Sequence, residues 1–484
     1  MSRVLENLQP DRVFYYFEEI CNIPHVSYHT EELSKYCEDF ARKHNLECHR
    51  DKLGNVIINK PATEGYENVP AVILQGHIDM VGAKSPESNH DFLKDPIELV
   101  MDGDWIKAKD TTLGADDGVA VAYALAILEN KDLKHPRLQV VLTVDEEVGL
   151  GGAEGIDESL LDAGYMINLD SDDEGVFLTG SAGGLRADVS LPVNITEFEG
   201  TELKIVINNL IGGHSGVEIG TGRPSANVLM GRLLKAYDDV ADYYIKDMAG
   251  GEVDNAICRE CIAYIVTDKD DISAIEAVSE KLMSDLRTEY RGIDDNITIS
   301  VQKVSEGAYS VADDFGKEKI LCLLRNLPYG VITRNADNVN FVETSLNPGV
   351  LRFKDGTFKL GYSVRSSVTS AKRELADRIQ FLTEYLGGSY EESGDYAAWT
   401  YVPESKLRDT IAKVYEEMYG NKPEFTTIHA GLECGIFSEK LPGIDIVSYG
   451  PESKDIHTYM ERLSISSTKK AYEFTLKLLE NITE

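Results

Sequence analysis

Five short clusters of acidic and histidine residues are spread over most of this 484-residue chain, and each follows or lies close to an apolar run typical of a buried strand. Imidazole and carboxylate groups are good ligands for zinc, and a carboxylate can also bridge two cations. A fold that gathers these clusters would hold a pair of divalent metal ions, so the pattern predicts metal-assisted hydrolysis. The clusters read Gly76-His77-Ile78-Asp79, Gly114-Ala115-Asp116-Asp117-Gly118, Asp145-Glu146-Glu147, Asn168-Leu169-Asp170 and Asp455-Ile456-His457.

Size and charge narrow the class of protein. Single hydrophobic cores usually stop growing below this length, so two or more domains are expected. The net charge of −35 disfavours nucleic acid and anionic membranes as partners, because phosphate binding needs clustered Lys and Arg. The N-terminal segment MSRVLENLQP lacks the apolar core of a signal peptide, and no stretch approaches the roughly 18 apolar residues of a membrane span. A cytoplasmic protein is therefore expected.

The first third of the chain alternates helical and strand patterns. The near-continuous apolar run at 71–75 is typical of a strand buried on both faces, and residues 116–130 form an Ala- and Val-rich helical pattern opened by acidic residues. This alternation of helices and strands predicts an α/β fold with a doubly wound sheet, in which ligand-binding sites form at the carboxyl ends of strands. The other expected helices are 10–21 and 31–45, and the other expected strands are 55–59, 138–144 and 165–169.

The middle of the chain changes character after Gly183-Gly184, where alternating apolar and polar residues predict strands with one solvated face. A similar succession of helix and strand recurs over 314–368, which is compatible with an internal doubling of this α+β region. The other expected strands are 185–193, 201–208, 261–266 and 297–304, and the expected helices are 224–242, 273–290 and 371–386.

The C-terminal segment returns to the first pattern, with helices at 404–419 and 466–482 and a buried strand at 444–448. His457 must therefore return to the site of the first domain, so the middle region is predicted to be an inserted lid. The predicted limits are 1–185 and 386–484 for the two parts of the catalytic domain and 186–385 for the lid, with Gly387-Gly388 as the return hinge.

The adjacent carboxylates Glu146 and Glu147 are the most diagnostic cluster. Two carboxylates directly after the apolar strand LQVVLTV are costly to gather unless a cation or a proton lies between them. Because neighbouring side chains at a strand end diverge, one can bind metal while the other takes a proton from metal-bound water. Similarly, His77 can bind metal with Asp79 orienting it, and a carboxylate of the 116–117 pair can bridge two cations. Both of these pairs could instead be structural caps.

Together the clusters resemble one family, the co-catalytic zinc aminoacylases, dipeptidases and glutamate carboxypeptidases. The family order of strand-H-x-D, G-x-x-D-[DN]-x-G, EE, D and a C-terminal H is matched along nearly the whole chain. Within the family the sequence is most similar to aminoacyl-histidine dipeptidases. The strings that carry this similarity are TLGADDGVAVA, TVDEEVGLGGA, INLDSDDEG, GGHSGVEI, HAGLECGIF and DIHTYMERLS.

The resemblance implies a two-metal centre. One zinc ion would be bound by His77 and Asp170, and the other by Glu147 and His457. Asp116 would bridge the two ions, and the peptide bond that follows it would be cis. The resemblance also implies the α/β catalytic domain with an inserted α+β lid.

The same resemblance implies roles for side chains that do not bind metal. Glu146 matches the general base, and Asp79 matches the carboxylate behind His77. In the lid, His214 of GGHSG would polarise the scissile carbonyl, and Arg365 of GYSVRSS would clamp a substrate carboxylate.

Three further residues are weaker candidates for substrate binding. Asn255 and Arg223 can reach a substrate or be structural, with neither alternative preferred. Glu433, in the glycine-bounded HAGLECG segment, is expected to line the pocket, as is His429, which opens that segment.

These observations predict a dinuclear zinc metallopeptidase that hydrolyses dipeptides of the Xaa-His type, with Glu146 as the base for a zinc-bridging water. Mn²⁺ and Co²⁺ are alternative metals. An N-acyl amino-acid deacylase or a carboxypeptidase of the same family is the closest alternative, and a non-catalytic metal-dependent peptide-binding protein is the alternative from another class. The resemblance favours a homodimer and leaves open whether His214 acts within its own chain or across subunits.

Overall fold

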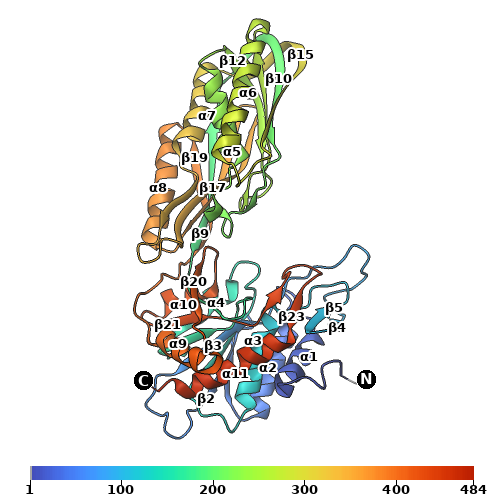
Figure 1. The fold of residues 1–484 in the computed structure, drawn as a ribbon, viewed down its shortest axis with the longest axis vertical. Helices are drawn as coiled ribbons and strands as arrows, with labels where there is room; N and C mark the ends of the chain where they lie inside the picture. Colours follow the sequence, from blue (N-terminus) through green and yellow to red (C-terminus); the bar gives the residue numbers. More distant parts are fainter. Residues whose placement is uncertain (1–2, 484) are drawn as a thin grey trace. The chain divides into compact units, whose positions relative to one another are not determined.

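The computed structural model describes residues 3–483, and the chain divides into two compact units (Figure 1). Unit 1 comprises the described residues up to Gly180, Tyr401–Thr427 and the segment from Leu432 onward, and unit 2 comprises Ser181–Thr400 and Ile428–Gly431. Each unit has its own core of buried apolar side chains. Two cores agree with the length of the chain, because single cores rarely grow beyond about 250–300 residues.

Unit 1 is built on an eight-stranded sheet with the order β1-β2-β6-β3-β7-β21-β8-β20. β3 (Val72–His77) pairs in parallel with β6 (Leu138–Thr143) and β7 (Tyr165–Asn168), and β7 pairs in parallel with β21 (Asp445–Ser448). The carboxyl ends of these strands therefore meet at one edge of the sheet. The other strands of this sheet are β1 (Glu47–Arg50), β2 (Val56–Lys60), β8 (Val176–Ser181) and β20 (Glu424–Ile428).

A smaller sheet and seven described helices complete unit 1. The small sheet has the order β22-β23-β5-β4, which brings the C-terminal part of the chain beside the N-terminal part. Its strands are β4 (Leu99–Asp102), β5 (Trp105–Ala108), β22 (Ser453–Lys454) and β23 (Arg462–Ser464). The helices are α1 (Asp11–Cys21), α2 (Glu31–Lys43), α3 (Ala115–Glu129), α4 (Gly151–Gly155), α9 (Lys406–Tyr419), α10 (Glu433–Lys440) and α11 (Ile465–Asn481).

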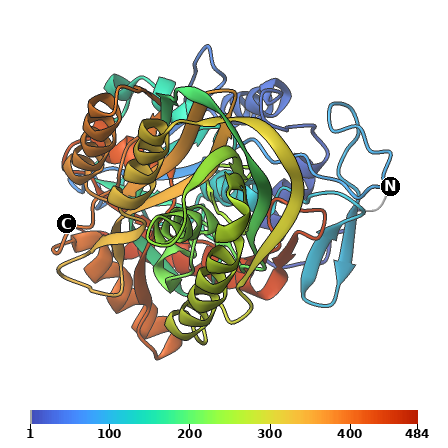
Figure 2. The same ribbon diagram turned by 90° about the horizontal axis from the view of Figure 1, so that it is seen from above.

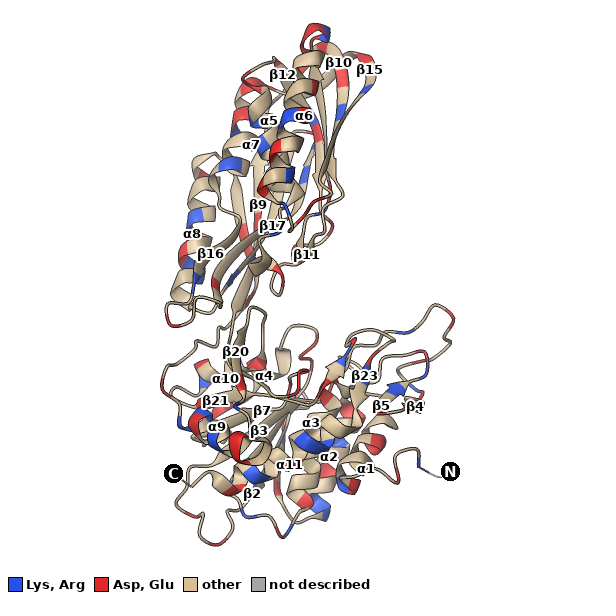
Figure 3. Cartoon of the chain, in the orientation of Figure 1, with Lys and Arg blue, Asp and Glu red and all other residues tan. Residues whose placement is uncertain are grey.

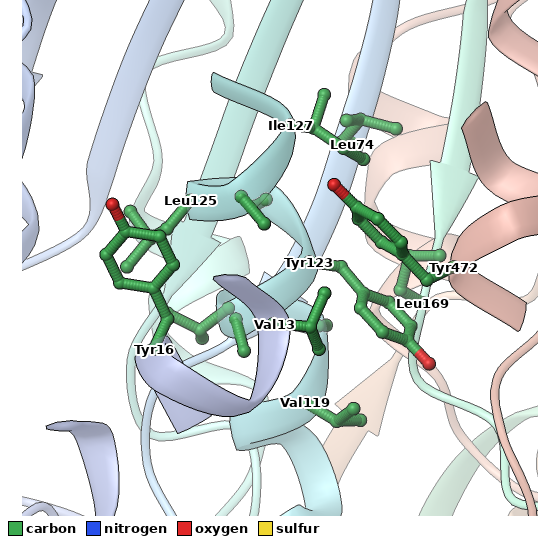
Figure 4. Close-up of a cluster of buried hydrophobic side chains, with 14 of the residues drawn as sticks. Val13, Tyr16, Leu74, Val119, Tyr123, Leu125, Ile127, Leu169 and Tyr472 are labelled. Atoms are coloured by element: carbon green, nitrogen blue, oxygen red, sulfur yellow. The ribbon is translucent and has the colours of Figure 1, made fainter. Parts of the chain in front are cut away.

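Almost every side chain of helix α3 is buried, as expected of a helix that is apolar on nearly all sides. Figure 4 shows its side chains among Val13 of α1, Leu74 of β3 and Tyr472 of α11. The Tyr123 hydroxyl of α3 also donates a hydrogen bond to the Thr468 carbonyl of α11 at 2.7 Å. The packing thus fixes the position of α3, whose first turn carries one of the acidic clusters.

Unit 2 is built on a nine-stranded antiparallel sheet with the order β15-β10-β14-β12-β17-β18-β9-β19, in which β16 also pairs with β17. Its helices lie on one face of this sheet (Figures 1 and 2). The helices are α5 (Ala226–Tyr237), α6 (Ile272–Glu289), α7 (Asp314–Asn326) and α8 (Thr369–Tyr385). The strands are β9 (Gly183–Pro192), β10 (Ile195–Asn208), β12 (Tyr243–Gly250), β14 (Cys261–Thr267), β15 (Thr298–Ala312), β16 (Gly330–Arg334), β17 (Val342–Lys354), β18 (Thr357–Ser366) and β19 (Ser389–Tyr396), with β11 (Gly213–His214) and β13 (Ala256–Ile257) forming a separate pair.

The predicted α/β class with an α+β lid is confirmed, but two strands of unit 2 are longer than predicted. β10 begins at Ile195 rather than at 201, and β15 ends at Ala312 rather than at 304. The added residues are mostly exposed. Alternation of apolar and polar residues is visible only where one face of a strand is buried, so these extensions had no pattern to reveal them.

The limits of the lid also differ from the predicted ones. Unit 2 extends from Ser181 to Thr400, whereas 186–385 was expected. The reason is that β19 pairs with β9, which holds 389–396 in the lid sheet although most of its side chains are exposed and polar. Gly387-Gly388 is therefore the turn between α8 and β19 rather than the hinge of return. Internal doubling of the lid stays a prediction.

Charged side chains cover both units. Figure 3 shows Lys and Arg interspersed with the more numerous Asp and Glu along the helices. The chain contains 83 acidic and 48 basic residues, which accounts for its net charge of −35. None of the described helices is long and apolar enough to cross a membrane.

Candidate metal centre and catalytic residues

The predicted metal ligands converge in unit 1, at the carboxyl ends of its parallel strands. His77 is the last residue of β3, Glu147 follows β6 and Asp170 follows β7. Asp116 lies in the first turn of α3, and His457 lies in the loop between β22 and β23. The structure therefore brings together side chains as far apart in the sequence as His77 and His457, which are separated by 380 positions.

Asp116 lies at the centre of this cluster. Its Oδ1 is 3.0 Å from His77 Nε2, and its Oδ2 is 3.1 Å from His457 Nε2. His457 Nε2 is also 3.0 Å from Glu147 Oε2, and His77 Nε2 is 4.0 Å from Asp170 Oδ1. Each oxygen of Asp116 thus faces one of two ligand groups, which is the arrangement of a carboxylate shared by two cations. Among the described residues, three groups of side chains are close enough together to hold a metal ion. They are His77, Asp116 and Asp170; Asp116, Glu147 and His457; and His77, Glu146 and Glu147.

The electrostatics of the cluster fit a pair of cations. Burial raises the pKa of Asp170 to about 7 and that of Glu146 well above its usual value, and neighbouring carboxylates add to both effects. Burial acts in the same direction on Asp116, but its hydrogen bonds to the two histidines outweigh it and lower the pKa of Asp116. Oε1 of Glu147 is buried without a hydrogen-bond partner among the described residues. Gathering so many buried carboxylates is costly unless positive charge is bound among them.

Asp79 connects His77 to the two glutamates. His77 Nδ1 lies 2.9 Å from the Asp79 carbonyl oxygen, which leaves Nε2 facing the cluster. The Asp79 carboxylate accepts hydrogen bonds from the backbone N–H groups of Glu146 at 3.0 Å and Glu147 at 3.4 Å, and from the Ser27 hydroxyl at 2.8 Å. One buried carboxylate therefore orients the loop that carries both glutamates, beyond its expected role behind the histidine.

The two carboxylates at 116–117 point in different directions, and the peptide bond between them is cis. Asp117 is buried, and its Oδ2 accepts a hydrogen bond from the His77 backbone N–H at 3.2 Å. Gly76 makes room for this contact, because a Cβ at that position would overlap Asp117 Oδ2 and lie 2.6 Å from the Ala120 Cβ. Asp116 thus belongs to the ligand cluster, while Asp117 ties α3 to β3.

Glu461 is a residue of this site that no sequence pattern indicates. It is 3% exposed, and its two carboxylate oxygens accept hydrogen bonds from four consecutive backbone N–H groups, those of 113–116. Its only signal in the sequence is its place in DIHTYMERLS, four positions after His457. A lone Glu in a loop gives no indication that it binds a backbone segment some 345 positions away.

Glu433 lies beneath the cluster and is completely buried. Its exposed fraction is 0%, and its Oε2 accepts hydrogen bonds from the Gln75 amide and from the Thr143 hydroxyl at 2.7 Å. Gln75 in turn accepts a hydrogen bond from the Asn168 amide at 2.6 Å. Glu433 therefore joins the ends of β3 and β6 directly and β7 only through Gln75, and burial leaves it no surface for the expected contact with a substrate.

His214 lies in a loop of unit 2 that holds it in one tautomer. Its Nδ1 accepts hydrogen bonds from the backbone N–H groups of Gly216 at 3.2 Å and Val217 at 3.3 Å. The ring proton must therefore be on Nε2, which makes Nε2 a hydrogen-bond donor. Burial and the positive charge of Arg365 lower the pKa of His214, so the neutral form is favoured.

The two weaker candidates in unit 2 both support the His214 loop. Arg223 Nη1 donates to the Gly212 carbonyl at 2.6 Å and lies 3.2 Å from Glu218 Oε1, while the other oxygen of Glu218 accepts from the His214 backbone N–H. The Asn255 carbonyl accepts from the Ser215 backbone N–H at 2.8 Å, and the Asn255 residue is exposed. Their backbone and side-chain contacts thus favour the structural alternative for Arg223 and leave the Asn255 side chain accessible.

Arg365 lies in a buried polar group of unit 2. The residue is 8% exposed, its Nη1 donates to the Tyr396 hydroxyl at 2.8 Å, and its Nε has no hydrogen-bond partner among the described residues. His429 Nε2 lies 2.7 Å from the Ser345 hydroxyl, and burial together with the Arg365 charge lowers the pKa of His429 to about 3. No sequence pattern indicates that Tyr396 belongs to this group. Gly184 leaves space for its ring, because a Cβ at position 184 would overlap it.

The chain is similar in sequence to known peptidases. The sequence model of peptidase family M20/M25/M40 matches residues 73–481. The chain is 35% identical over 481 residues to the cytosol non-specific dipeptidase of Escherichia coli, an alignment that covers 99% of each chain.

The fold is likewise similar to solved structures. The crystal structure of aminoacylhistidine dipeptidase from Vibrio alginolyticus superimposes with a TM-score of 0.94 at 35% identity, covering 98% of this chain and 97% of that one. An aminopeptidase from Bacillus cereus shares the fold with a TM-score of 0.56 at 16% identity, covering 99% of this chain and 100% of that one. The predicted family is thereby confirmed: the chain belongs to peptidase family M20/M25/M40.

Proposed function

We propose that this chain is a dinuclear metallodipeptidase that hydrolyses unblocked dipeptides, including those of the Xaa-His type. The observation that carries the proposal is the position of Asp116, whose two oxygens face two separate groups of ligand atoms. The full-length relatives named as dipeptidases support the substrate class. A cytoplasmic location and a homodimer are part of the same proposal, from the sequence.

The proposed ligands are divided between two ions. His77 and Asp170 would hold one, Glu147 and His457 would hold the other, and Asp116 would be shared. Zinc is the metal that imidazole and carboxylate ligands favour, with Mn²⁺ and Co²⁺ as alternatives. When bound, the metal pair supplies an acidified water and polarises the substrate carbonyl.

Glu146 is the proposed general base. It follows β6 beside Glu147, and its backbone N–H is fixed by the buried Asp79 carboxylate. Burial raises the pKa of Glu146 above its ordinary value, which makes the carboxylate a stronger base. Glu146 accepts a proton from the attacking water and then donates it to the leaving amine.

Unit 2 supplies the proposed groups that bind the substrate. The neutral His214 ring presents Nε2–H as a donor for the carbonyl oxygen that becomes negative in the transition state. Arg365 is suited to bind the free C-terminal carboxylate of a dipeptide, because a guanidinium binds a carboxylate with two parallel hydrogen bonds. The Arg365 Nε has no hydrogen-bond partner among the described residues and is therefore available to a substrate, whereas Nη1 already donates to the Tyr396 hydroxyl.

The test combines a substrate panel with one substitution. We expect the metal-loaded protein to cleave Xaa-His and other free dipeptides faster than N-acetyl amino acids or longer peptides. Glu146→Gln should lower kcat by about 10²- to 10⁴-fold, the usual contribution of a general base, while the protein keeps its bound metal.

A matched control is Glu154→Gln, the same change at an exposed position of α4 in the same unit. It should leave both kcat and metal content unchanged. Undiminished turnover by Glu146→Gln would overturn the assignment of the base. Preferential cleavage of N-acetyl amino acids would identify a deacylase, and binding without turnover by the metal-loaded wild type would identify a peptide-binding protein.

A further inference from the structure

Glu461 holds the backbone segment that ends in Asp116. Oε2 of Glu461 accepts hydrogen bonds from the N–H groups of Leu113 at 2.7 Å and Gly114 at 3.0 Å. Oε1 accepts from Ala115 at 2.8 Å and Asp116 at 3.3 Å. A carboxylate that is 3% exposed thus satisfies the N–H groups that open α3, which have no partner inside the helix.

The same loop also carries His457. Glu461 lies four positions after this histidine, and its backbone N–H donates to the Thr458 carbonyl at 3.1 Å, which closes a turn between the two residues. One short segment therefore supplies both an imidazole of the cluster and the carboxylate that fixes Asp116. His457 Nε2 and Asp116 Oδ2 lie 3.1 Å apart.

Only a carboxylate satisfies all of these hydrogen bonds. Two acceptor oxygens face four N–H donors, so a Gln side chain would turn its own NH₂ group towards two of them. The segment is also closely packed at Gly114. Gly114 has φ of +73°, and a Cβ at that position would lie 2.8 Å from the Met80 sulfur.

We propose that Glu461 is a positioning residue of the metal centre, which sets the geometry between Asp116 and His457 and thereby the affinity of the ion bound by Asp116, Glu147 and His457. The proposal rests on the metal centre proposed above. Glu461 is assigned no contact with the metal or the substrate, because all of the described hydrogen bonds of its carboxylate are to backbone N–H groups.

The test is a metal titration that does not depend on activity. Metal-free wild type and Glu461→Gln are titrated with Zn²⁺ against a competing chelator of known affinity. We expect the wild type to bind two ions. The variant should bind the ion held by Asp116, Glu147 and His457 about 10- to 100-fold more weakly, the usual effect of losing a residue that orients metal ligands, and should bind the ion held by His77, Asp116 and Asp170 with a smaller loss of affinity.

Glu18→Gln is the matched control. Glu18 is also a buried glutamate of unit 1, 7% exposed, whose carboxylate accepts from two consecutive backbone N–H groups, those of Val4 and Leu5. It contacts none of the proposed ligands through these bonds. Glu18→Gln should therefore leave both zinc affinities unchanged. If it lost as much zinc affinity as Glu461→Gln, general destabilisation would explain the effect and the proposal would be overturned.

The remaining outcomes separate this proposal from the proposed function. Wild type that binds two ions together with an unaltered Glu461→Gln would overturn the positioning role alone. Wild type that binds no ion would overturn the metal centre itself. If Glu461→Gln does not fold, Glu461→Asp keeps the charge but withdraws the carboxylate by one methylene, and unaltered affinity for both ions in that variant would equally overturn the role of Glu461.

Discussion

At the scale of single residues, this protein buries several carboxylates whose oxygens are not all hydrogen-bonded. Glu433 is the clearest case, because it is completely buried and its Oε1 has no hydrogen-bond partner among the described residues. Both donors that reach it, from Gln75 and Thr143, bind the other oxygen. The protonated acid is therefore favoured in the folded metal-free protein, and burial raises the pKa of Glu433 to about 7.

Glu433→Gln is expected to change how stability depends on pH. Between its ordinary pKa near 4.5 and about pH 7, the unfolded chain ionises Glu433 while the folded chain keeps it protonated. The folded state thus binds more protons, so the free energy of unfolding of the wild type falls as pH rises through this window. Gln mimics the protonated acid and removes this loss, which amounts to roughly 3 kcal/mol at 1.36 kcal/mol per pKa unit.

The measurement is urea unfolding of the metal-free wild type and variant at pH 4.5 and pH 8. The two proteins should have similar stability at the lower pH, and the variant should be the more stable at the higher pH. A constant difference between them at both pH values would contradict the raised pKa of Glu433.

At the scale of elements, the contact between β3 and α3 determines where the ligands lie. The end of β3 carries His77, the first turn of α3 carries Asp116, and the Asp117 carboxylate joins the two elements by accepting from the His77 N–H. The approach is close enough that only glycine is accommodated at position 76. A sequence pattern of apolar runs predicts both elements but not the distance between them.

Gly76→Ala is expected to separate these two elements. Its Cβ would lie 2.6 Å from the Ala120 Cβ, which is closer than real carbon atoms approach. We expect a loss of about 1–3 kcal/mol in the free energy of unfolding, as for other overpacked sites, together with weaker zinc binding, both measured on the purified variant.

Gly118→Ala, in the facing helix α3, is the control for this substitution. Its Cβ would meet Ile20 at 3.5 Å and Phe17 at 3.6 Å, which are ordinary contacts. Since Ala also favours helix more than Gly, this variant should be at least as stable as the wild type with unchanged zinc affinity. Equal behaviour of the two variants would show that the β3–α3 approach is not tight.

At the scale of the whole molecule, the two kinds of functional residue lie in different units. The proposed metal ligands and Glu146 are all in unit 1, whereas His214 and Arg365 are in unit 2. Each unit has a separate hydrophobic core. Binding of metal should therefore stabilise one unit and leave the other unchanged.

The two tryptophans allow this to be tested, because Trp105 lies in unit 1 and Trp399 in unit 2. Denaturant unfolding followed by fluorescence in Trp399→Phe reports on unit 1, and in Trp105→Phe on unit 2. Zinc at 100 times its dissociation constant should stabilise unit 1 by about 2.7 kcal/mol. A chelator should reverse the shift, and an equal shift in unit 2 would mean that the units unfold together.

The sequence by itself determined the fold class, the family and which clusters could bind metal. Apolar runs such as that of β3 report local burial, and the residue types in each cluster limit the chemistry, so His77, Asp116 and His457 could be selected as candidates without coordinates. The selection of candidates for the metal centre needed no knowledge of the distance between them.

Only the tertiary structure decided which side chains support that centre. Glu461 binds N–H groups some 345 positions away, Glu433 proved to be buried beneath the cluster, and β19 stays in the lid because it pairs with β9. Such interactions join segments that are distant in the chain, and they leave no periodic pattern around either partner. Local sequence reports whether a residue is buried or exposed, but which distant backbone or side chain it meets is determined by the packing of the whole unit.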